Sequence, residues 1–119
     1  MTILVVDDDP GVRFALSEVL SERGHRVITA ASGHEALDKL EGVDVVVTDL
    51  VMPGMDGLEL VSRIAERAPA LPVILVTAHG SDQMVRIAQG RGACGCVRKP
   101  FDIDEIAAVI EHARAPSHG

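Results

Sequence analysis

Aromatic side chains are almost absent from this chain of 119 residues, which has no Trp or Tyr and carries only Phe14 and Phe101. Sites that stack nucleic-acid bases or a flavin use several aromatic faces, so the composition argues against both. The core must therefore be built from Val, Ile, Leu and Ala. Hydrophobic residues make up 47% of the chain, which suits one globular domain of ordinary size.

Cysteine and long apolar runs are also scarce. Cys94 and Cys96 form a C-x-C, which supplies neither a disulfide framework nor a complete zinc site. No apolar run approaches the roughly 18 residues of a membrane span. The N-terminal segment does not follow the pattern of a signal or transit peptide. We therefore expect a cytoplasmic protein that makes no contact with a membrane.

Positive charge is in deficit. The 11 Lys and Arg residues are scattered and the net charge is −7. Proteins that bind nucleic acid through phosphates gather basic residues on one surface. We therefore expect no direct binding of nucleic acid.

The chain instead contains five short apolar runs rich in β-branched residues, separated by segments with helical spacing. The predicted strands are residues 2–6, 25–30, 44–48, 72–77 and 94–97. Three of them are apolar throughout, which is typical of strands buried on both faces. This alternation predicts one α/β domain, a doubly wound five-stranded parallel sheet with five helices, over residues 1–115. Residues 116–119 are expected to be a disordered tail.

Helix signals fill the intervals between the strands. Pro10 and Gly24 bound the first helix, and Ser32 and Glu35 form a capping box at the second. The third ends before Pro69. The fourth is predicted over residues 82–90 and the fifth from residue 102.

Polar residues end the predicted strands. Asp7 and Asp8 follow the first strand, Asp49 the third, Thr77 ends the fourth and Lys99 follows the fifth. The carboxyl ends of parallel strands share one edge of a sheet, where ligands bind in such folds. Two carboxylates about 5 Å apart repel by roughly 3 kcal/mol at an effective dielectric of about 20. A divalent cation would remove that repulsion.

Three carboxylates and one ammonium leave a net charge that one divalent ion neutralises. Oxygen ligands favour Mg²⁺, with Mn²⁺ as an alternative. A metal beside a carboxylate points to phosphoryl transfer through an acyl phosphate. Asp49 stands alone at a strand end and is the best candidate for the nucleophile.

Four segments, VVDDDP, VVVTDLVMPGMDGLEL, PVILVTAHG and GACGCVRKPF, resemble the receiver domain of two-component response regulators from about residue 2 to 114. The resemblance implies the flavodoxin-like strand order 2-1-3-4-5. It also implies that Asp49 accepts a phosphoryl group from a sensor histidine kinase or a phosphotransfer protein. Such a domain is a switch that catalyses only its own phosphorylation and dephosphorylation.

The resemblance also implies the ligands of the metal. Asp8 and Asp49 are expected to bind Mg²⁺ directly, together with the backbone carbonyl of Val51, and Asp7 through water. In the same family the matching lysine, here Lys99, pairs with the acceptor and then with the phosphoryl group.

The remaining family features concern the switch. Thr77 is expected to bond a phosphoryl oxygen and to move on activation, and the bond before Pro100 to be cis. Cys96 stands where relatives have an aromatic residue, so the aromatic half of their switch is missing. Val51 and His79 occupy positions that tune phosphate lifetime, and an apolar Val51 predicts slow self-dephosphorylation.

Activation is expected to change the face formed by the fourth helix, fifth strand and fifth helix, which would bind an effector domain or form a homodimer. The motifs are most similar to receivers of transcriptional regulators that act with alternative sigma factors.

Three other functions stay open at this point. Asp7-x-Asp9 resembles the nucleophile motif of haloacid-dehalogenase-like phosphatases. A flavodoxin-like electron carrier shares the fold but needs a different loop after the first strand. A non-phosphorylated pseudo-receiver is the third alternative. We interpret Asp9 as a helix-start residue, Asp56 as part of a turn into the third helix, and His25, His34, His112 and His118 as surface residues.

Overall fold

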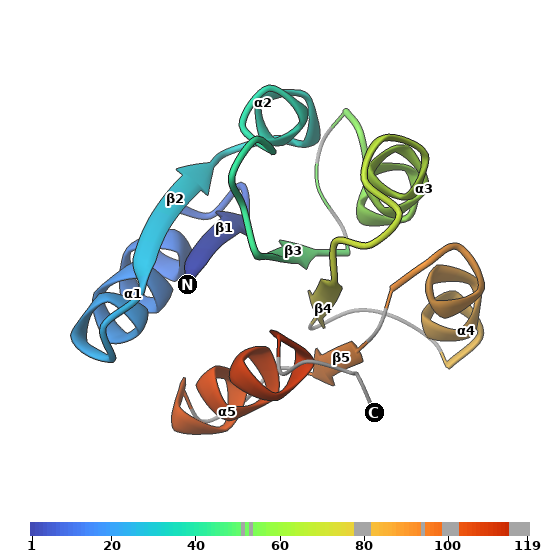
Figure 1. Ribbon diagram of the computed structural model, residues 1–119. Helices are drawn as coiled ribbons and strands as arrows, with labels where there is room; N and C mark the ends of the chain where they lie inside the picture. The colour runs from blue at the N-terminus through green and yellow to red at the C-terminus, as the bar shows by residue number, and fades with distance from the viewer. Residues whose placement is uncertain (51, 53, 78–81, 94, 99–102, 115–119) are drawn as a thin grey trace.

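The computed structural model describes residues 1–50, 52, 54–77, 82–93, 95–98 and 103–114. Strands and helices alternate along the chain (Figure 1). The elements are β1 (Thr2–Val6), α1 (Pro10–Glu22), β2 (Arg26–Ala30), α2 (Gly33–Leu37), β3 (Val45–Asp49), α3 (Gly57–Arg67), β4 (Val73–Thr77), α4 (Asp82–Gly90), β5 (Gly95–Arg98) and α5 (Ile103–Arg114).

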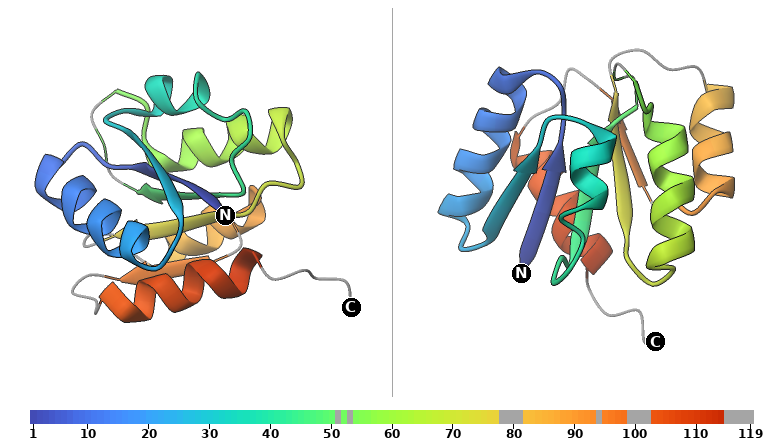
Figure 2. Two further views of the ribbon diagram at one scale, coloured as in Figure 1. Left: turned by 60° about the vertical axis from the view of Figure 1, so that its left-hand side comes forward. Right: turned by 90° about the horizontal axis from the view of Figure 1, so that it is seen from above.

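The strands form one parallel sheet in the order β2-β1-β3-β4-β5 (Figure 2), which confirms the predicted fold and strand order. Strand order reverses between β1 and β3, because the chain moves outward from β1 to β2 and then returns to β3 on the other side. In open sheets of this type, ligands bind at that reversal, beyond the carboxyl ends of the strands.

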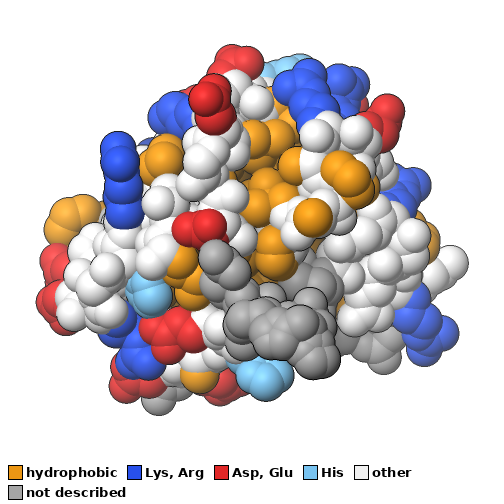
Figure 3. All heavy atoms as spheres, viewed as in Figure 1, with side chains coloured by type: hydrophobic (Ala, Val, Ile, Leu, Met, Phe, Trp, Pro, Cys, Tyr) orange, Lys and Arg blue, Asp and Glu red, His pale blue; other side chains and the backbone are white. Residues whose placement is uncertain are grey.

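The sheet is covered on both faces, as the apolar strands predicted. On one face, side chains of β1, β3 and β4 pack with α1 and α5; this cluster includes Val47, Leu20 and Ile110. On the other face the strands pack with α2, α3 and α4 in a second cluster. Partly buried apolar residues extend this second cluster, and Figure 3 shows hydrophobic side chains reaching the surface between α2 and α3.

The helix starts follow the sequence signals closely. Asp9 and Asp56 are the N-caps of α1 and α3, as predicted, and their carboxylates accept hydrogen bonds from the backbone N–H groups of Gly11 and Glu59. These bonds satisfy donors that a helix start otherwise leaves unpaired. Gly24 ends α1 with a φ of 91°, a conformation that glycine adopts without a side-chain clash.

The capping box at α2 differs in one bond from the expected pattern. Ser32 accepts from the Glu35 N–H, but Glu35 reaches back to the N–H of Ala31 instead of that of Ser32. The same Glu35 carboxylate lies 3.0 Å from the ammonium of Lys39, which lowers its pKa. Lys39 also donates to the carbonyl of Thr29 on β2, at 2.8 Å.

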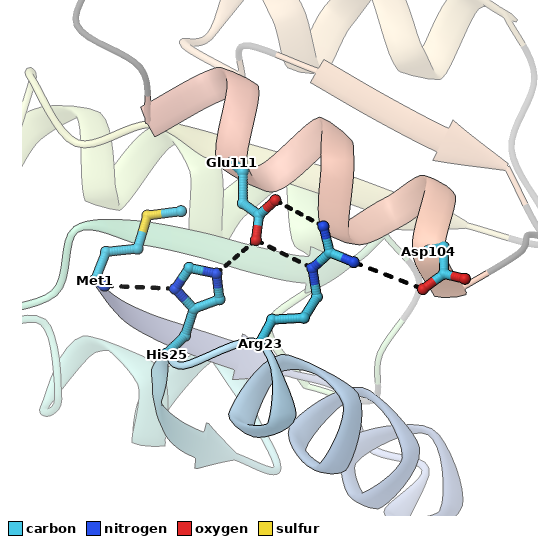
Figure 4. A network of polar contacts seen from close by, with 5 residues as sticks. All are labelled: Met1, Arg23, His25, Asp104 and Glu111. Carbon is cyan, nitrogen blue, oxygen red and sulfur yellow. Dashed lines mark hydrogen bonds and ion pairs between the residues drawn. The ribbon is translucent and has the colours of Figure 1, made fainter.

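A polar network joins the end of α1 to α5 (Figure 4). Arg23 donates two hydrogen bonds to Glu111, at 3.0 and 3.1 Å, and lies 3.7 Å from Asp104. His25 Nε2 is 2.7 Å from Glu111, and its Nδ1 is 3.4 Å from the amino group of Met1. The hydrogen bonds from Arg23 and His25 lower the pKa of Glu111 from 4.5 to about 2.

This network corrects the interpretation of His25 as a surface residue. Its side chain is only 13% exposed and contacts Glu111, 86 residues later in the sequence. His34 and His112 are exposed, as predicted, whereas His118 lies outside the described residues.

Two strands end one residue later than predicted, and two others, β2 and β4, begin one residue later. β3 covers residues 45–49 instead of 44–48, so Asp49 belongs to the strand, and Asp44 instead accepts a hydrogen bond from the Thr2 N–H at 2.7 Å. β5 covers residues 95–98 and so ends one residue after the predicted 94–97, while residue 94 lies outside the described residues. Within the described part of the chain, no helix has the length and apolar character needed to cross a bilayer.

Candidate functional site

Three carboxylates from two neighbouring strand ends converge at the sheet edge. Asp7 and Asp8 follow β1, and Asp49 is the last residue of β3. Val6 lies opposite Thr48 in the β1–β3 register, so the next residues, Asp7 and Asp49, meet at the edge. One carboxylate oxygen from each of Asp7, Asp8 and Asp49 lies within 4.8 Å of the others.

The three acids differ in exposure. Asp7 is 3% exposed, Asp49 is half-buried and Asp8 is exposed. Asp7 Oδ1 accepts a hydrogen bond from the Asp9 N–H at 2.9 Å, and the Asp7 N–H donates to the carbonyl of Ala30 on β2. Backbone bonds on both sides therefore hold Asp7 in one orientation.

Arg13 contacts the loop that carries Asp7 and Asp8, a role that the sequence analysis did not predict. Its guanidinium donates to the carbonyl oxygen of Asp7 at 2.6 Å. The only sequence signal is that Arg13 lies one helical turn after Asp9, at the start of α1. Arg13 thus ties α1 to the loop that carries Asp7 and Asp8.

The backbone of Asp49 is held just as closely. The hydroxyl of the buried Thr48 donates to the Asp49 carbonyl at 3.0 Å. Gly57, at the start of α3, lies very close to the backbone of Asp49 and Leu50. A Cβ added to Gly57 would lie 2.5 Å from the backbone carbonyl oxygen of Asp49 and 2.7 Å from the Leu50 Cα. The Gly57 N–H also donates to the Leu50 carbonyl at 2.8 Å. This position therefore requires glycine, a steric demand that the sequence analysis missed.

The spacing of the three acids fits a small divalent cation. Octahedral Mg²⁺ has bonds of about 2.0–2.1 Å, so its ligand oxygens lie about 3 to 4 Å apart. A group within 4.8 Å reaches that range by a small side-chain adjustment, or when one acid binds through water. Hard carboxylate oxygens are the donors that Mg²⁺ prefers.

The other predicted site residues are placed only through the backbone. Asp49 lies opposite Val76 in the β3–β4 register, so Thr77 is one residue further along the adjacent strand. Thr77 in turn lies opposite Arg98, which immediately precedes Lys99 in the sequence. The Thr77 side chain and four predicted residues, Val51, His79, Lys99 and Pro100, lie outside the described residues.

Cys96 lies on β5, opposite Leu75 of β4. It is half-buried and packs against the core cluster on the face covered by α2, α3 and α4. This agrees with the prediction of a small, half-buried cysteine; Cys94 lies outside the described residues.

Comparison with known proteins gives consistent matches. Residues 3–111 match the family described as the response regulator receiver domain. The DNA-binding transcriptional regulator NtrC of Klebsiella pneumoniae is 44% identical over 116 residues, covering 96% of this chain and 24% of NtrC. Sporulation initiation phosphotransferase F of Bacillus subtilis is 40% identical over 111 residues, covering 92% of this chain and 90% of that protein.

Solved structures give the same result. The receiver domain of NtrX from Brucella abortus matches with a TM-score of 0.90 and 34% identity, covering 97% of this chain and 99% of that one. The chain therefore spans about a quarter of the length of NtrC but 90% of sporulation initiation phosphotransferase F and 99% of the solved NtrX receiver domain.

Proposed function

Because this chain belongs to the response regulator receiver domain family, we propose that it is a phosphorylation-dependent signalling switch with Asp49 as its phosphoacceptor. The observation that carries the assignment is the convergence of Asp7, Asp8 and Asp49 at the β1–β3 reversal of the sheet. The sequence also supplies a Thr and a Lys at the ends of the next two strands, at Thr77 and Lys99.

Exposure favours Asp49 over Asp7 as the acceptor. Asp7 is nearly buried, and one of its oxygens already accepts from the Asp9 N–H. Asp49 is half-buried, so a phosphodonor can reach it, while Thr48 and Gly57 fix its backbone. A haloacid-dehalogenase-like phosphatase would need Asp7 as nucleophile, so the alternative loses support from both the geometry and the family match.

The transfer itself requires little covalent chemistry from the protein. An Asp49 oxygen attacks the phosphorus of a phosphohistidine, the new P–O bond forms, and the P–N bond breaks with its electron pair returning to the imidazole. Asp49 supplies the attacking oxygen and holds it in line, which is the main catalytic contribution in such reactions. The Lys99 ammonium would neutralise charge on the phosphoryl oxygens, and the Thr77 hydroxyl would donate to one of them.

Asp8, Asp49 and the Val51 carbonyl would hold Mg²⁺, with Asp7 acting through water and Mn²⁺ as a substitute. When bound, the ion supplies positive charge opposite the oxygens of the transferring group. It also offsets the repulsion among the three acids, so the metal should stabilise the folded protein.

The partners follow from this chemistry. We assign a sensor histidine kinase or a phosphotransfer protein as donor, in the cytoplasm, and the face of α4, β5 and α5 as the output surface for an effector domain or a homodimer. Relatives such as NtrC are named as DNA-binding transcriptional regulators, which supports control of transcription as the output of the longer protein.

The test is acetyl phosphate labelling with Mg²⁺, read by intact-protein mass spectrometry. We expect one phosphoryl group on the wild type, none after EDTA treatment and none on Asp49→Asn. Asp9→Asn is the matched control, because Asp9 is a nearby exposed acid outside the converging group, and it should be labelled like the wild type. Labelling of Asp49→Asn, or a borohydride-trapped adduct on Asp7, would refute the assignment.

A further inference from the structure

We infer that Gly33, the first residue of α2, is a positioning residue for the acidic site, because it leaves the space in which Met55 packs. Met55 belongs to the β3–α3 connection, which directly follows Asp49. The inference rests on the proposed Mg²⁺-dependent phosphorylation of Asp49 and assigns a second element, α2, to the support of that site.

The contact between Gly33 and Met55 leaves no room for a side chain. A Cβ built on Gly33 would lie 2.8 Å from Met55 Sδ and 3.0 Å from both its Cγ and its Cβ. Ordinary contact begins at 3.4 Å. Both residues are buried, with Met55 only 2% exposed. Met55 therefore lies directly on the backbone of α2, 22 residues earlier in the sequence.

The β3–α3 connection is held at two places. At its base, next to Asp49, the Gly57 N–H bonds the Leu50 carbonyl, and the Gly57 backbone contacts Asp49 and Leu50. Further along, Met55 rests on Gly33. Gly54, directly before Met55, has a φ of 82°, so the chain turns sharply there. Met55 and Gly57 are two residues apart, so a displacement of Met55 is passed to the backbone that carries Asp49.

The atoms that an alanine at Gly33 would meet include the Met55 Cβ, which cannot rotate away as the end of a side chain can. The backbone of the connection would have to move to restore ordinary contact. A magnesium site tolerates such movement poorly, because the ion demands near-ideal octahedral geometry. Residues that hydrogen-bond to metal ligands typically change metal affinity by about 10–100-fold when they are replaced, and Gly33, which acts through Met55 and the backbone, is expected to lie at the lower end.

The experiment is a Mg²⁺ titration by calorimetry of the wild type, Gly33→Ala, Met55→Ala and the double variant. Gly33→Ala should weaken Mg²⁺ binding about tenfold. The double variant should lose less Mg²⁺ affinity than the two single variants together, because the alanine at 33 then no longer meets Met55 Sδ and Cγ and only the Cβ contact remains. Gly90→Ala is the matched control, since nothing lies within 4 Å of a Cβ at that helical glycine, and it should bind like the wild type.

A second measurement tests the contact between Gly33 and Met55 in the absence of metal. The chain has four Met residues, so methyl-labelled methionine gives a simple NMR spectrum in which Met55→Ala identifies the Met55 signal. In the metal-free protein, Gly33→Ala should shift the Met55 signal and leave that of Met1 unchanged. If Gly33→Ala does not fold, Met55→Leu replaces it, because the second methyl group that branches from the leucine Cγ adds bulk beside Gly33 and should also weaken Mg²⁺ binding.

The outcomes separate the two proposals. If the wild type binds Mg²⁺ and the affinity of Gly33→Ala, or of Met55→Leu where that variant replaces it, differs by less than about twofold, the inference is overturned and the proposed function is not. Additive losses in the double variant would do the same. Absence of Mg²⁺ binding by the wild type would instead overturn the proposed function.

Discussion

Glu111 of α5 offers a quantitative test of how the helices are held on the sheet. Its carboxylate accepts two hydrogen bonds from Arg23, at the end of α1, and contacts His25 at 2.7 Å. Glu111→Gln keeps the size of the side chain and removes its charge. We expect this variant to unfold more easily at pH 7, because the charged bonds to Arg23 and His25 are weakened.

The size of the effect follows from the pKa of Glu111, which is lowered from 4.5 to about 2. At about 1.36 kcal/mol per pH unit this corresponds to about 3 kcal/mol. The Glu111 side chain is 33% exposed and that of Arg23 38%, so solvent screening reduces the contribution to about 1–2 kcal/mol. For a domain of this size, that is a decrease in melting temperature of about 4–8 °C.

The pH dependence is distinctive. The folded-state pKa lies below the unfolded value, so the stabilisation is complete above pH 4.5 and is lost as the pH falls toward 2. At pH 3 less than about half of it should remain. Urea unfolding followed by far-ultraviolet circular dichroism is the appropriate assay, because the chain lacks Trp and Tyr.

The control is Glu18→Gln, at an exposed position in the middle of α1, which should change stability little at either pH. If Glu111→Gln destabilises the protein equally at pH 7 and pH 3, the charge of Glu111 is not the cause and the reasoning fails.

Two further predictions concern the connection between β3 and α3. Val51→Asn should shorten the lifetime of the phosphorylated protein, because an amide can orient attacking water; a longer lifetime of the phosphoprotein by mass spectrometry would contradict this. Asp56→Ala removes the N-cap bond to the Glu59 N–H, 2.9 Å long, and should reduce the free energy of unfolding by about 1 kcal/mol in urea, whereas Asp56→Asn should retain most of it.

The fold could be predicted from the sequence because its signals are local. Runs such as residues 2–6 and 72–77 are apolar enough to be buried on both faces, and the intervals between strands are long enough for right-handed crossovers. Asp9, Asp56 and Gly24 each act on the helix beside them, so they were interpreted correctly. The later start of β3 reflects the contact of Asp44 with Thr2, which no local pattern specifies.

The acidic site was predictable for a different reason. Parallel strands bring their carboxyl ends to one edge, so Asp7, Asp8 and Asp49 could be expected to meet. Contacts between distant positions were not predictable. His25 is held by Glu111, 86 residues away, and Met55 depends on space at Gly33. Such pairs are determined by how the helices pack, which spacing along one chain does not reveal.

Lys39 has a consequence for the outer side of the sheet. The Ala30 carbonyl accepts a hydrogen bond from the N–H of Asp7, which directly follows β1. Successive carbonyls of a strand point in opposite directions, so the Thr29 carbonyl points away from the sheet. The Lys39 ammonium donates a hydrogen bond to that carbonyl. A second chain that paired with β2 as a sixth strand would have to displace the Lys39 ammonium from this carbonyl. Lys39 therefore disfavours edge-to-edge association at β2, the kind of pairing that leads to cross-β aggregates.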